Sequence, residues 1–358
     1  IGSNSTTGIV GTTTLDITNG GILDLGGSLS FDGARRNSNA IVNVTAGSSL
    51  LVGGSLGIQN NTIVRDGQLI GGAASSGDIT ILVDNSLLNF GSLDLNANID
   101  GTTSQSDSRF TAGDITISAL NGATISGGSG FVSASANNNN DGGIANGGII
   151  TFDVNDAALS FTSSLFATAG GVGGASDNPL NIGRGGGFGG DIIFRLQGTS
   201  GSMAFNDIFA DADGSFDAGC EECGFGGFGG GGLGDGGNAA GGTITVDILD
   251  GIFTGDQINF GADGFGGEGA SGTFDDGTSG IAPFGAALVG PLPPISFAPV
   301  VVIGNGGTGT GGNVTFNLNG GNATVTSLDV TADGFAGSGS FGSINDGTVG
   351  GDGGDGFG

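Results

Sequence analysis

A unit that returns along the chain is the feature that most constrains the fold. From residue 77 onward, a glycine followed by alternating residues opens the unit six times. The openings are Gly77-Asp-Ile-Thr-Ile, Gly113-Asp-Ile-Thr-Ile, Gly148-Ile-Ile-Thr-Phe, Gly190-Asp-Ile-Ile-Phe, Gly242-Thr-Ile-Thr-Val and Gly312-Asn-Val-Thr-Phe. They lie 36, 35, 42, 52 and 70 residues apart, so a fixed unit carries connections of different length. Such self-similarity is typical of architectures in which successive units stack.

Alternation within the unit predicts strands, because a strand turns successive side chains to opposite faces. Three inward positions recur, so stacking predicts three apolar columns. The first is Ile79, Ile115, Ile150, Ile192, Ile244 and Val314; the second is Ile81, Ile117, Phe152, Phe194, Val246 and Phe316; the third is Val83, Ala119, Val154, Leu196, Ile248 and Leu318. An outward column holds Thr80, Thr116, Thr151, Ile193, Thr245 and Thr315.

Each of these strands ends in residues that favour a sharp corner. The corners are Asp84-Asn85, Asn121-Gly122, Asn155-Asp156, Gln197-Gly198, Asp250-Gly251 and Asn319-Gly320. Asn, Asp and Gly tolerate the left-handed backbone angles that such corners need. A second short strand follows, as in Ala123-Thr-Ile-Ser. A third has the pattern Ser-Leu-x-apolar, as in Ser92-Leu-Asp-Leu and Ser327-Leu-Asp-Val.

The first 76 residues carry the third-strand pattern in shorter units, at Ser28-Leu-Ser-Phe and Ser55-Leu-Gly-Ile. We therefore predict one all-β domain over residues 1–358, a parallel β-helix with three short strands per coil and about eight coils. Residues 1–76 would form short coils, and residues 77–358 six coils whose Gly-rich loops lengthen along one side. An antiparallel sandwich also alternates, but the unit lacks evenly spaced hairpin turns.

Composition limits the possible partners. The chain has 34 acidic and 6 basic residues, a net charge of −28, and 84 glycines among 358 residues. Binding to nucleic acid or to anionic membranes needs clustered Lys and Arg, so neither partner is expected. Divalent cations, above all calcium, are the natural counter-ions for such a surface.

The missing residue types limit the chemistry. The sequence contains no His and no Lys, so it cannot form a Ser-His-Asp triad, a Schiff-base lysine or a His metal site. A carboxylate-pair hydrolase is the common catalytic design that stays possible. The candidate pairs are Asp153 with Asp191, and Asp207 with Asp211 and Asp213. Against this interpretation, the chain has no Trp or Tyr to stack on sugars.

The units that begin Gly-Asp-Ile-Thr-Ile, turn at Asn-Gly or Asp-Gly and continue with Ser-Leu-x-apolar resemble the strand repeats of large secreted bacterial exoproteins. These are filamentous-haemagglutinin-like proteins and autotransporter passengers, and the resemblance covers residues from about 12 to 335. It implies a right-handed parallel β-helix, exposed on or released from a bacterial surface, that acts as an adhesin or a structural fibre. The family's Asn-Pro-Asn secretion motif is missing, since the one Asn-Pro is Asn178-Pro179.

The Gly-rich segments leave the same corner of successive units, so we expect them side by side on one face. Flexible linkers have similar composition. We favour an ordered side layer or subunit interface, because phenylalanines recur inside the segments and could form a second small core. These are Phe225, Phe228, Phe265, Phe335 and Phe341.

Residues 281–303 form an apolar, Pro-rich loop insertion. Five prolines argue against a membrane helix, and no membrane insertion is expected. The segment either folds over its own rod or marks a contact with a neighbouring subunit. The candidate interface residues are Ile281, Pro283, Phe284, Leu288, Pro291, Pro294, Phe297 and Val301.

Aspartates at the repeated Ala-Asp-Gly corner are candidate calcium ligands. They are Asp213, Asp263 and Asp333; Asn98 and Asn137 follow Ala at comparable points, and Asp352 and Asp355 lie in a late segment that faintly resembles a calcium-binding nonapeptide. Aspartate also favours turns for purely conformational reasons, which is the alternative interpretation.

Two cysteines, Cys220 and Cys223, are the only ones in the chain. One pair cannot provide the four thiolates of a structural zinc site. In an exported protein we expect a local disulfide that fixes the loop.

The sequence thus predicts a non-enzymatic extracellular β-solenoid, a structural or adhesive segment of a bacterial surface fibre. Self-association into filaments or a longer chain is expected, because no cap is evident at either end; a host or neighbouring-cell glycan or protein is a further partner. The alternative is a tailspike-like β-helix that binds or degrades polysaccharide. The threonine column also allows ice binding, although strand propensity explains it more simply. The opening Ile1-Gly2-Ser3 lacks a signal peptide, which suggests a mature or excised piece.

Overall fold

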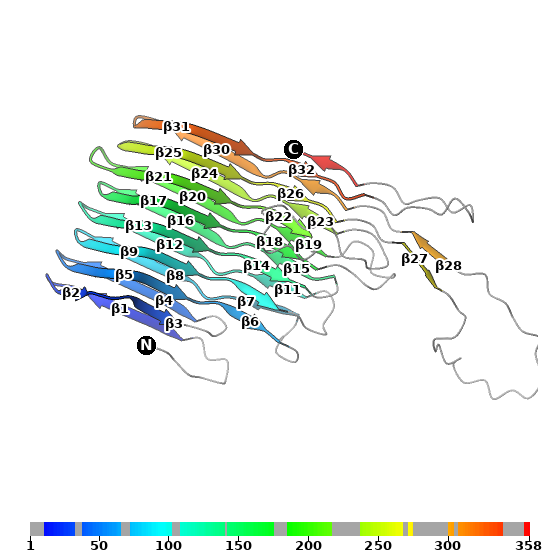
Figure 1. Ribbon diagram of the computed structural model, residues 1–358, viewed down its shortest axis with the longest axis horizontal. Helices are drawn as coiled ribbons and strands as arrows, with labels where there is room; N and C mark the ends of the chain where they lie inside the picture. Colours follow the sequence, from blue (N-terminus) through cyan, green and yellow to red (C-terminus); the bar gives the residue numbers. More distant parts are fainter. Residues whose placement is uncertain are drawn as a thin grey trace, which may run out of the picture.

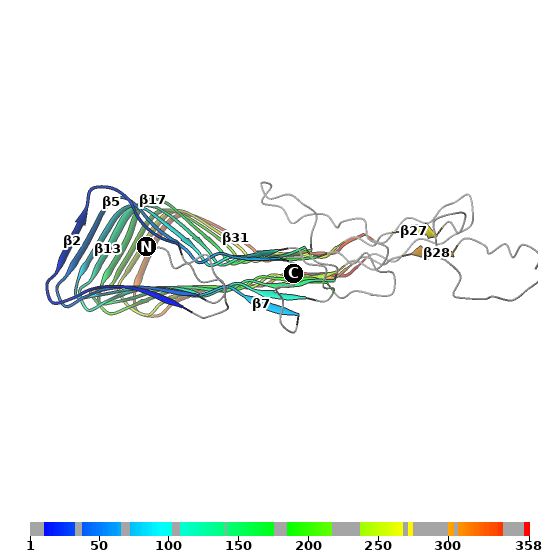
Figure 2. The ribbon, with the colours of Figure 1, turned by 90° about the horizontal axis from the view of Figure 1, so that it is seen from below.

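The computed structural model describes residues 11–32, 38–65, 72–101, 108–139, 142–174, 185–216, 237–267, 271–274, 300–303, 307–338 and 354–358. The regular structure of these residues is entirely β, without a helix. Two long-stranded sheets form a wide body and two short-stranded sheets form a narrow arm (Figures 1 and 2).

The body consists of two parallel sheets. The first body sheet is β1 (Thr12–Ile17), β4 (Asn39–Thr45), β8 (Ile79–Asp84), β12 (Ile115–Leu120), β16 (Ile149–Asn155), β20 (Asp191–Gln197), β24 (Thr243–Ile248) and β30 (Asn313–Leu318). The second body sheet is β2 (Ile22–Leu25), β5 (Ser49–Gln59), β9 (Leu87–Asn96), β13 (Thr124–Ser133), β17 (Ala158–Thr168), β21 (Ser202–Asp211), β25 (Ile252–Gly261) and β31 (Asn322–Thr331), with β3 (Leu29–Asp32) also on β5.

The arm consists of two parallel sheets of two- and three-residue strands. The first arm sheet is β6 (Thr62–Val64), β10 (Ile99–Gly101), β14 (Ala136–Asn138), β18 (Gly171–Gly173), β22 (Gly214–Phe216), β26 (Gly264–Phe265) and β32 (Gly334–Phe335). The second arm sheet is β7 (Ala73–Ser75), β11 (Arg109–Thr111), β15 (Ile144–Asn146), β19 (Gly186–Phe188), β23 (Asn238–Ala240), β29 (Gly309–Thr310) and β33 (Gly356–Phe357). A separate antiparallel pair joins β27 (Ser271–Phe274) to β28 (Val300–Ile303).

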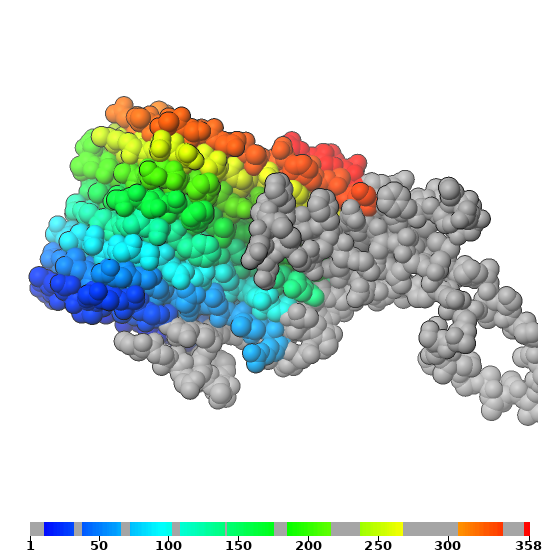
Figure 3. All heavy atoms as spheres, in the orientation of Figure 1, coloured from blue at the N-terminus to red at the C-terminus, as the bar shows by residue number. Residues whose placement is uncertain are grey.

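The chain visits the four sheets in a fixed order. After β8 in the first body sheet come β9, β10 and β11, and then β12 returns beside β8. Successive circuits therefore form layers, seen as colour bands from blue to orange in Figure 3. This is the solenoid-like parallel stacking that the repeat predicts.

The predicted columns of the first body sheet are confirmed residue by residue. Ile115 lies opposite both Ile79 and Ile150, and the column continues through Ile192 and Ile244 to Val314. The second and third columns follow in the same registers. The five isoleucines of the first column are completely buried, so this column is core. The threonine column forms on the outward side, where Thr14 and then Ile41 precede Thr80.

The predicted second and third strands are one strand in the structure. The strand β9, for example, spans both patterns of its unit, and the register of this sheet shifts at a bulge between Phe161 and Ser164. A bulge bends a strand without ending its ladder. The corners between the two body sheets are as predicted, with positive φ at Asn85, Asn121 and Asp156.

Glycine at the unit opening has a steric cause. A Cβ on Gly113 would meet the carbonyl oxygen of Gly77, and one on Gly148 would meet that of Gly113. The same relation continues through Gly190 and Gly242 to Gly312. Only a residue without a side chain can stack this closely on its equivalent in the next layer.

The arm sheets face each other through columns that become smaller along the stack. In the first arm sheet the column is Thr62, Ile99, Ala136, Gly171, Gly214, Gly264 and Gly334. In the second it is Ala74, Phe110, Ala145, Gly187, Ala239, Gly309 and Gly356. A Cβ on Gly214 would meet the carbonyl oxygen of Ala240 across the arm, so backbone meets backbone in the later layers.

The arm contains a second small core that the sequence did not predict. It lies in the early layers and comprises Val64, Ile99, Phe110, Ala112, Ala136 and Ala145. Phe265 and Phe335 stack at 4.9 Å between ring centroids, but Phe335 is 47% exposed. In the first arm sheet, Gly264 and Gly334 take the inward positions, and the alternation of the strand therefore turns Phe265 and Phe335 outward. Phe225, Phe228 and Phe341 lie outside the described residues.

Candidate functional site

A column of polar residues marks the junction between the second body sheet and the first arm sheet. We call it the junction ladder: Asn61, Asn98, Ser135, Gly170, Asp213, Asp263 and Asp333, one residue per layer. Each side-chain oxygen accepts a hydrogen bond from the backbone N–H of the next rung. Asn98 Oδ1 accepts from Ser135 N at 2.8 Å, and Asp213 Oδ1 accepts from Asp263 N at 2.6 Å. The ladder satisfies donors that the chain exposes where it leaves one sheet for another.

The ladder is interrupted at Gly170, which has no side chain to accept a bond. Ser135 Oγ still accepts from Gly170 N at 3.2 Å. One layer further, Asp213 N instead donates to Oδ1 of Asp211, its neighbour two residues back, at 2.9 Å. The carboxylate of Asp211 therefore takes the place of the acceptor that Gly170 lacks.

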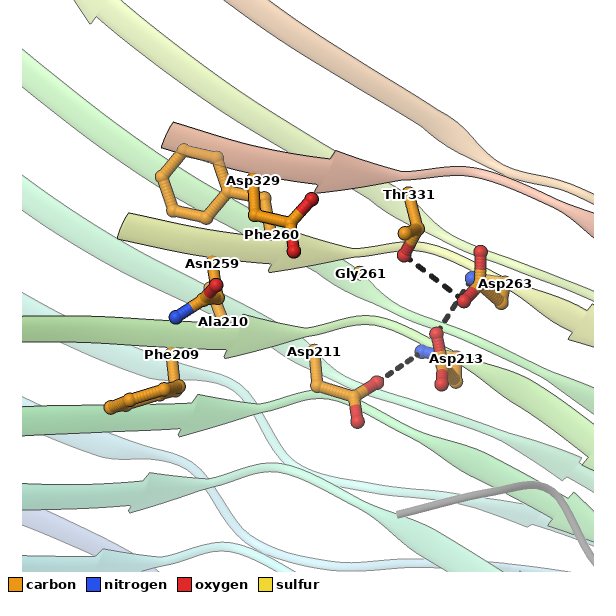
Figure 4. Close-up of a pocket in the computed structure, with 10 residues that line it drawn as sticks. All are labelled: Phe209, Ala210, Asp211, Asp213, Asn259, Phe260, Gly261, Asp263, Asp329 and Thr331. Carbon is orange, nitrogen blue, oxygen red and sulfur yellow. Dashed lines mark hydrogen bonds between the residues drawn. The ribbon is translucent and has the colours of Figure 1, made fainter. Parts of the chain in front are cut away.

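A hollow lies beside this point, with a volume of about 250 Å³. A neighbouring column passes through Thr168, Asp211, Gly261 and Thr331, and Gly261 leaves the space between Asp211 and Thr331 unfilled. In Figure 4, Asp211, Asp213 and Asp263 lie close to one another, whereas Asp329 lies apart from them, beside Phe260. The lining residues are Phe209, Ala210, Asp211, Asp213, Asn259, Phe260, Gly261, Asp263, Asp329 and Thr331.

Burial dominates the electrostatics of the hollow. Burial raises the pKa of Asp213 to about 8, and the charge of Asp211 adds to the shift. Burial also raises the pKa of Asp211, against the lowering effect of its hydrogen bonds with Asp213. Asp213 is therefore largely protonated at neutral pH, and the two side chains are hydrogen-bonded to each other.

A strip of outward phenylalanines borders the hollow. Phe131, Phe166 and Phe209 occupy one column of the second body sheet. Phe131 and Phe166 are 44% and 43% exposed, and the rings of Phe166 and Phe209 stack at 4.9 Å. This strip is not among the predicted features, although its phenylalanines occupy the outward position x of the Ser-Leu-x-apolar pattern.

The structure brings Asp213, Asp263 and Asp333 into one column, as the Ala-Asp-Gly repeat predicts. Asn98 belongs to the same ladder, but the placement of Asn137 was wrong. Ser135 occupies that rung, and Asn137 lies opposite Asp100 in β14, where its side-chain oxygen is buried. Asp355 lies apart from the ladder, next to β33, where its carbonyl accepts from Gly309 N.

The candidate catalytic pairs are only partly brought together. Asp211 and Asp213 meet at the hollow, whereas Asp207 accepts from Ser164 Oγ at 3.2 Å and does not line it. Asp153 lies opposite Arg195 and Asp191 opposite Ile149, so that pair is four positions out of register.

Several predicted residues lie outside the described residues, namely Cys220, Cys223, Asp352, Ile281, Pro283, Phe284, Leu288, Pro291, Pro294 and Phe297. Val301 lies in β28, opposite Thr273.

The calcium prediction is not tested by this arrangement. Within the described ranges, no group of three or more acidic or cysteine side chains is arranged to hold a metal ion. The ladder carboxylates instead hydrogen-bond to backbone and threonine: Asp263 Oδ1 accepts from Asp333 N at 2.6 Å, and its Oδ2 accepts from Thr331 Oγ1 at 3.0 Å.

No protein-family model, curated protein or solved structure matches this chain. The resemblance to secreted bacterial exoproteins therefore stays a prediction. In the part of the chain that the structure describes, no helix has the length and apolarity needed to cross a membrane.

Proposed function

We propose that the chain is a right-handed parallel β-helix of about eight coils that serves as a non-enzymatic structural or adhesive element at a bacterial surface. The observation that carries the proposal is the continuous core. Apolar side chains repeat in register from β1 to β30, and the core cluster extends from Ile17 to Phe260. Such a stack has stability distributed along its length, which suits a load-bearing or displaying rod.

The net charge of −28 supports an exposed setting, because self-repulsion keeps a Gly-rich β-surface dispersed. The carboxylates at the hollow support a non-catalytic role. Asp211 and Asp213 are hydrogen-bonded to each other, whereas the two carboxyl groups of glycosidases are roughly 5–10 Å apart.

The test combines imaging with an assay for hydrolysis. Electron microscopy of the 358-residue chain should show rods, and a reducing-sugar assay over a panel of polysaccharides should show no turnover. Release of reducing ends that disappears in the Asp211→Asn variant would contradict the proposal and favour the tailspike-like alternative.

Polysaccharide binding is a second candidate, favoured by the phenylalanine strip beside the hollow. The exposed rings of the strip offer an apolar surface to sugar rings, and Asn259, Asp211 and Asp329 offer acceptors to hydroxyl groups. A glycan array should show binding that Phe166→Ala weakens, whereas Phe357→Ala, which removes an exposed phenylalanine of the arm, should leave it unchanged. Equal effects of both variants would reject this site.

Calcium binding by the junction ladder is tested by chelation. Binding predicts that a chelator lowers the melting temperature by several degrees and that calcium, but not sodium at equal ionic strength, restores it. An unchanged melting temperature would leave the ladder with its hydrogen-bonding role alone.

A further inference from the structure

The last strand of the first body sheet leaves the core columns open. In β30, Leu318 is 52% exposed, whereas Ile248, its partner in β24, is fully buried. Val314 and Phe316 in the same strand are only partly buried. The outer edge of β30 has no hydrogen-bonded neighbour among the described strands. Apolar side chains and an unpaired edge together favour addition of another strand.

The first strand leaves the same columns partly open at the other end. Leu15 in β1 is partly buried, whereas its partner Val42 is 1% exposed. Leu23 and Leu29 in β2 and β3 are partly buried too. Leu15, Leu23 and Leu29 therefore leave part of the same columns open at this end, whereas Ile17 and Phe31 are only 8% and 3% exposed.

The sequences of β30 and β1, the two end strands of the first body sheet, alternate in the same way as those of neighbouring strands within the sheet. Asn313–Leu318 reads Asn-Val-Thr-Phe-Asn-Leu, and Thr12–Ile17 reads Thr-Thr-Thr-Leu-Asp-Ile. Continuing the observed register places Leu15 of a second copy over Phe316 and Ile17 over Leu318. It also extends the threonine column, with Thr14 over Thr315.

The second body sheet gives an independent match. The columns of this sheet end at Val325, Leu328 and Val330 in β31 and begin at Leu25, Leu29 and Phe31. Leu328 and Val330 are 49% and 45% exposed. In the continued register, Leu29 of a second copy covers Leu328. Phe31 of that copy lies over Val330, although it is only 3% exposed in its own chain.

Charge complementarity supports the same partner. The continued register places Asp16 over Asn317, Asp24 over Thr324 and Ser30 over Asp329, so no aspartate at these positions meets another. The chain already uses the Asn–Asp contact between layers, since Asn43 Nδ2 donates to Asp16 Oδ1 and Asn317 Nδ2 donates to Asp247 Oδ1, both at 2.7 Å. A chain with a net charge of −28 would reject most other end contacts.

We propose that the chain stacks head to tail on a second copy of itself, with β1 of one copy pairing in parallel and in register with β30 of the next. The inference rests on the structural role proposed above and names its partner. The contact joins two different surfaces, so it does not close and generates a filament. Each added copy extends the columns and buries the exposed Leu318, Leu328 and Val330.

The test uses the 358-residue chain and a variant that places like charges at the contact. Ser30→Asp puts a carboxylate over Asp329 of the next copy, whereas within its own chain Ser30 lies opposite Gly57. The control is Ser163→Asp, the same substitution at an exposed residue of β17, at the bulge between Phe161 and Ser164 in the middle of the stack. Filament assembly is followed by sedimentation velocity and electron microscopy over a range of protein concentrations.

Wild type and Ser163→Asp should assemble at the same concentration, and Ser30→Asp should need about tenfold more protein or higher. Adding Asp329→Arg to Ser30→Asp should restore assembly. Circular dichroism should show that all variants fold alike.

Monomers at every concentration of wild type, or equal assembly of wild type and Ser30→Asp, would overturn head-to-tail stacking. Closed dimers that do not grow would overturn it as well, because they require like ends to meet. None of these outcomes bears on the rod shape and the absence of hydrolysis, by which the proposed function is judged separately.

Discussion

The body and the arm are built from the same circuits of chain but are held together in opposite ways. In the body, Ile, Leu, Val and Phe fill the space between two long-stranded sheets, and the rings of Phe152 and Phe194 stack at 4.9 Å. In the later arm layers, glycines bring the two sheets into backbone contact. Parallel stacking therefore fixes the strand order, whereas side-chain volume decides how far apart the facing sheets lie.

The comparison predicts that loss of volume harms the body most. Phe194→Ala removes a ring that is 1% exposed and that contacts Phe152, Phe205 and Phe260. We expect the free energy of unfolding to fall by about 3–5 kcal/mol, because the cavity is enclosed by neighbouring layers. Denaturant titration measures the change, and a loss below about 1 kcal/mol would show that the body is loosely packed.

Gain of volume should harm the arm. Gly214→Ala places a methyl group against the carbonyl oxygens of Ala240 and Gly187, and we expect a loss of about 1–3 kcal/mol. Gly27→Ala is the control, because a Cβ there has no neighbour within 4 Å. Equal thermal stability of the two variants would mean that the arm sheets separate easily. It would contradict the claim that close backbone contact holds the arm together.

The junction between the two regions should respond to pH. The pKa of Asp213 in the folded protein is about 8, above its ordinary value of 3.8, so the folded state binds more protons than the unfolded chain between these values. This contribution to stability is present on the acid side and is lost as pH rises through about 8. Asp213→Asn keeps an acceptor for Asp263 N and should flatten the decline.

Thermal unfolding from pH 4 to pH 9 measures this effect. Asp333→Asn, at the exposed end of the same ladder, controls for the change in net charge. We expect the melting temperature of the wild type to fall from pH 6 to pH 9 and that of Asp213→Asn to fall less. If neither melting temperature falls over this range, a buried and protonated Asp213 is contradicted.

The smallest expected effect is an increase in the free energy of unfolding. A Cβ on Gly170 has only ordinary contacts, the closest at 3.5 Å, so Gly170→Asn should complete the junction ladder. Its Oδ1 would accept from Asp213 N, and we expect about 0.5–1.5 kcal/mol of stabilisation. Chemical denaturation of Gly170→Asn beside Gly170→Ala separates the hydrogen bond from the loss of glycine flexibility; equal stability of the two would show that no rung forms.

The body could be predicted from sequence because its signal is carried by side chains. Ile79, Ile115 and Ile150 repeat at one distance from a fixed corner, and register then follows from burial of one face. The arm could not be predicted from the sequence. Strands such as Gly171–Gly173 are too short to show alternation, and their inward residues are glycines, which carry no side chain. The connections of unequal length also hid Phe110, which no repeat position marks.

The candidate site was predicted in part for the same reason. Asp213, Asp263 and Asp333 share an Ala-Asp-Gly context, so their column was visible. The earlier rung at Ser135 has a different side chain with the same acceptor role, and residue identity alone pointed to Asn137 instead. The hollow exists because Gly261 has no side chain to fill the space, and this could be seen only once the neighbouring layers were in place.

Because the arm thins from Ile99 and Ala136 to Gly171 and Gly214, an early layer and a late layer are not interchangeable. A layer moved from the late part of the stack to the early part would leave an empty slot, and an early layer moved late would wedge its neighbours apart. Lengthening such a molecule by duplicating a unit is therefore tolerated where adjacent layers are already alike, at the glycine-packed end, and the order of the units is as much a part of the architecture as their number.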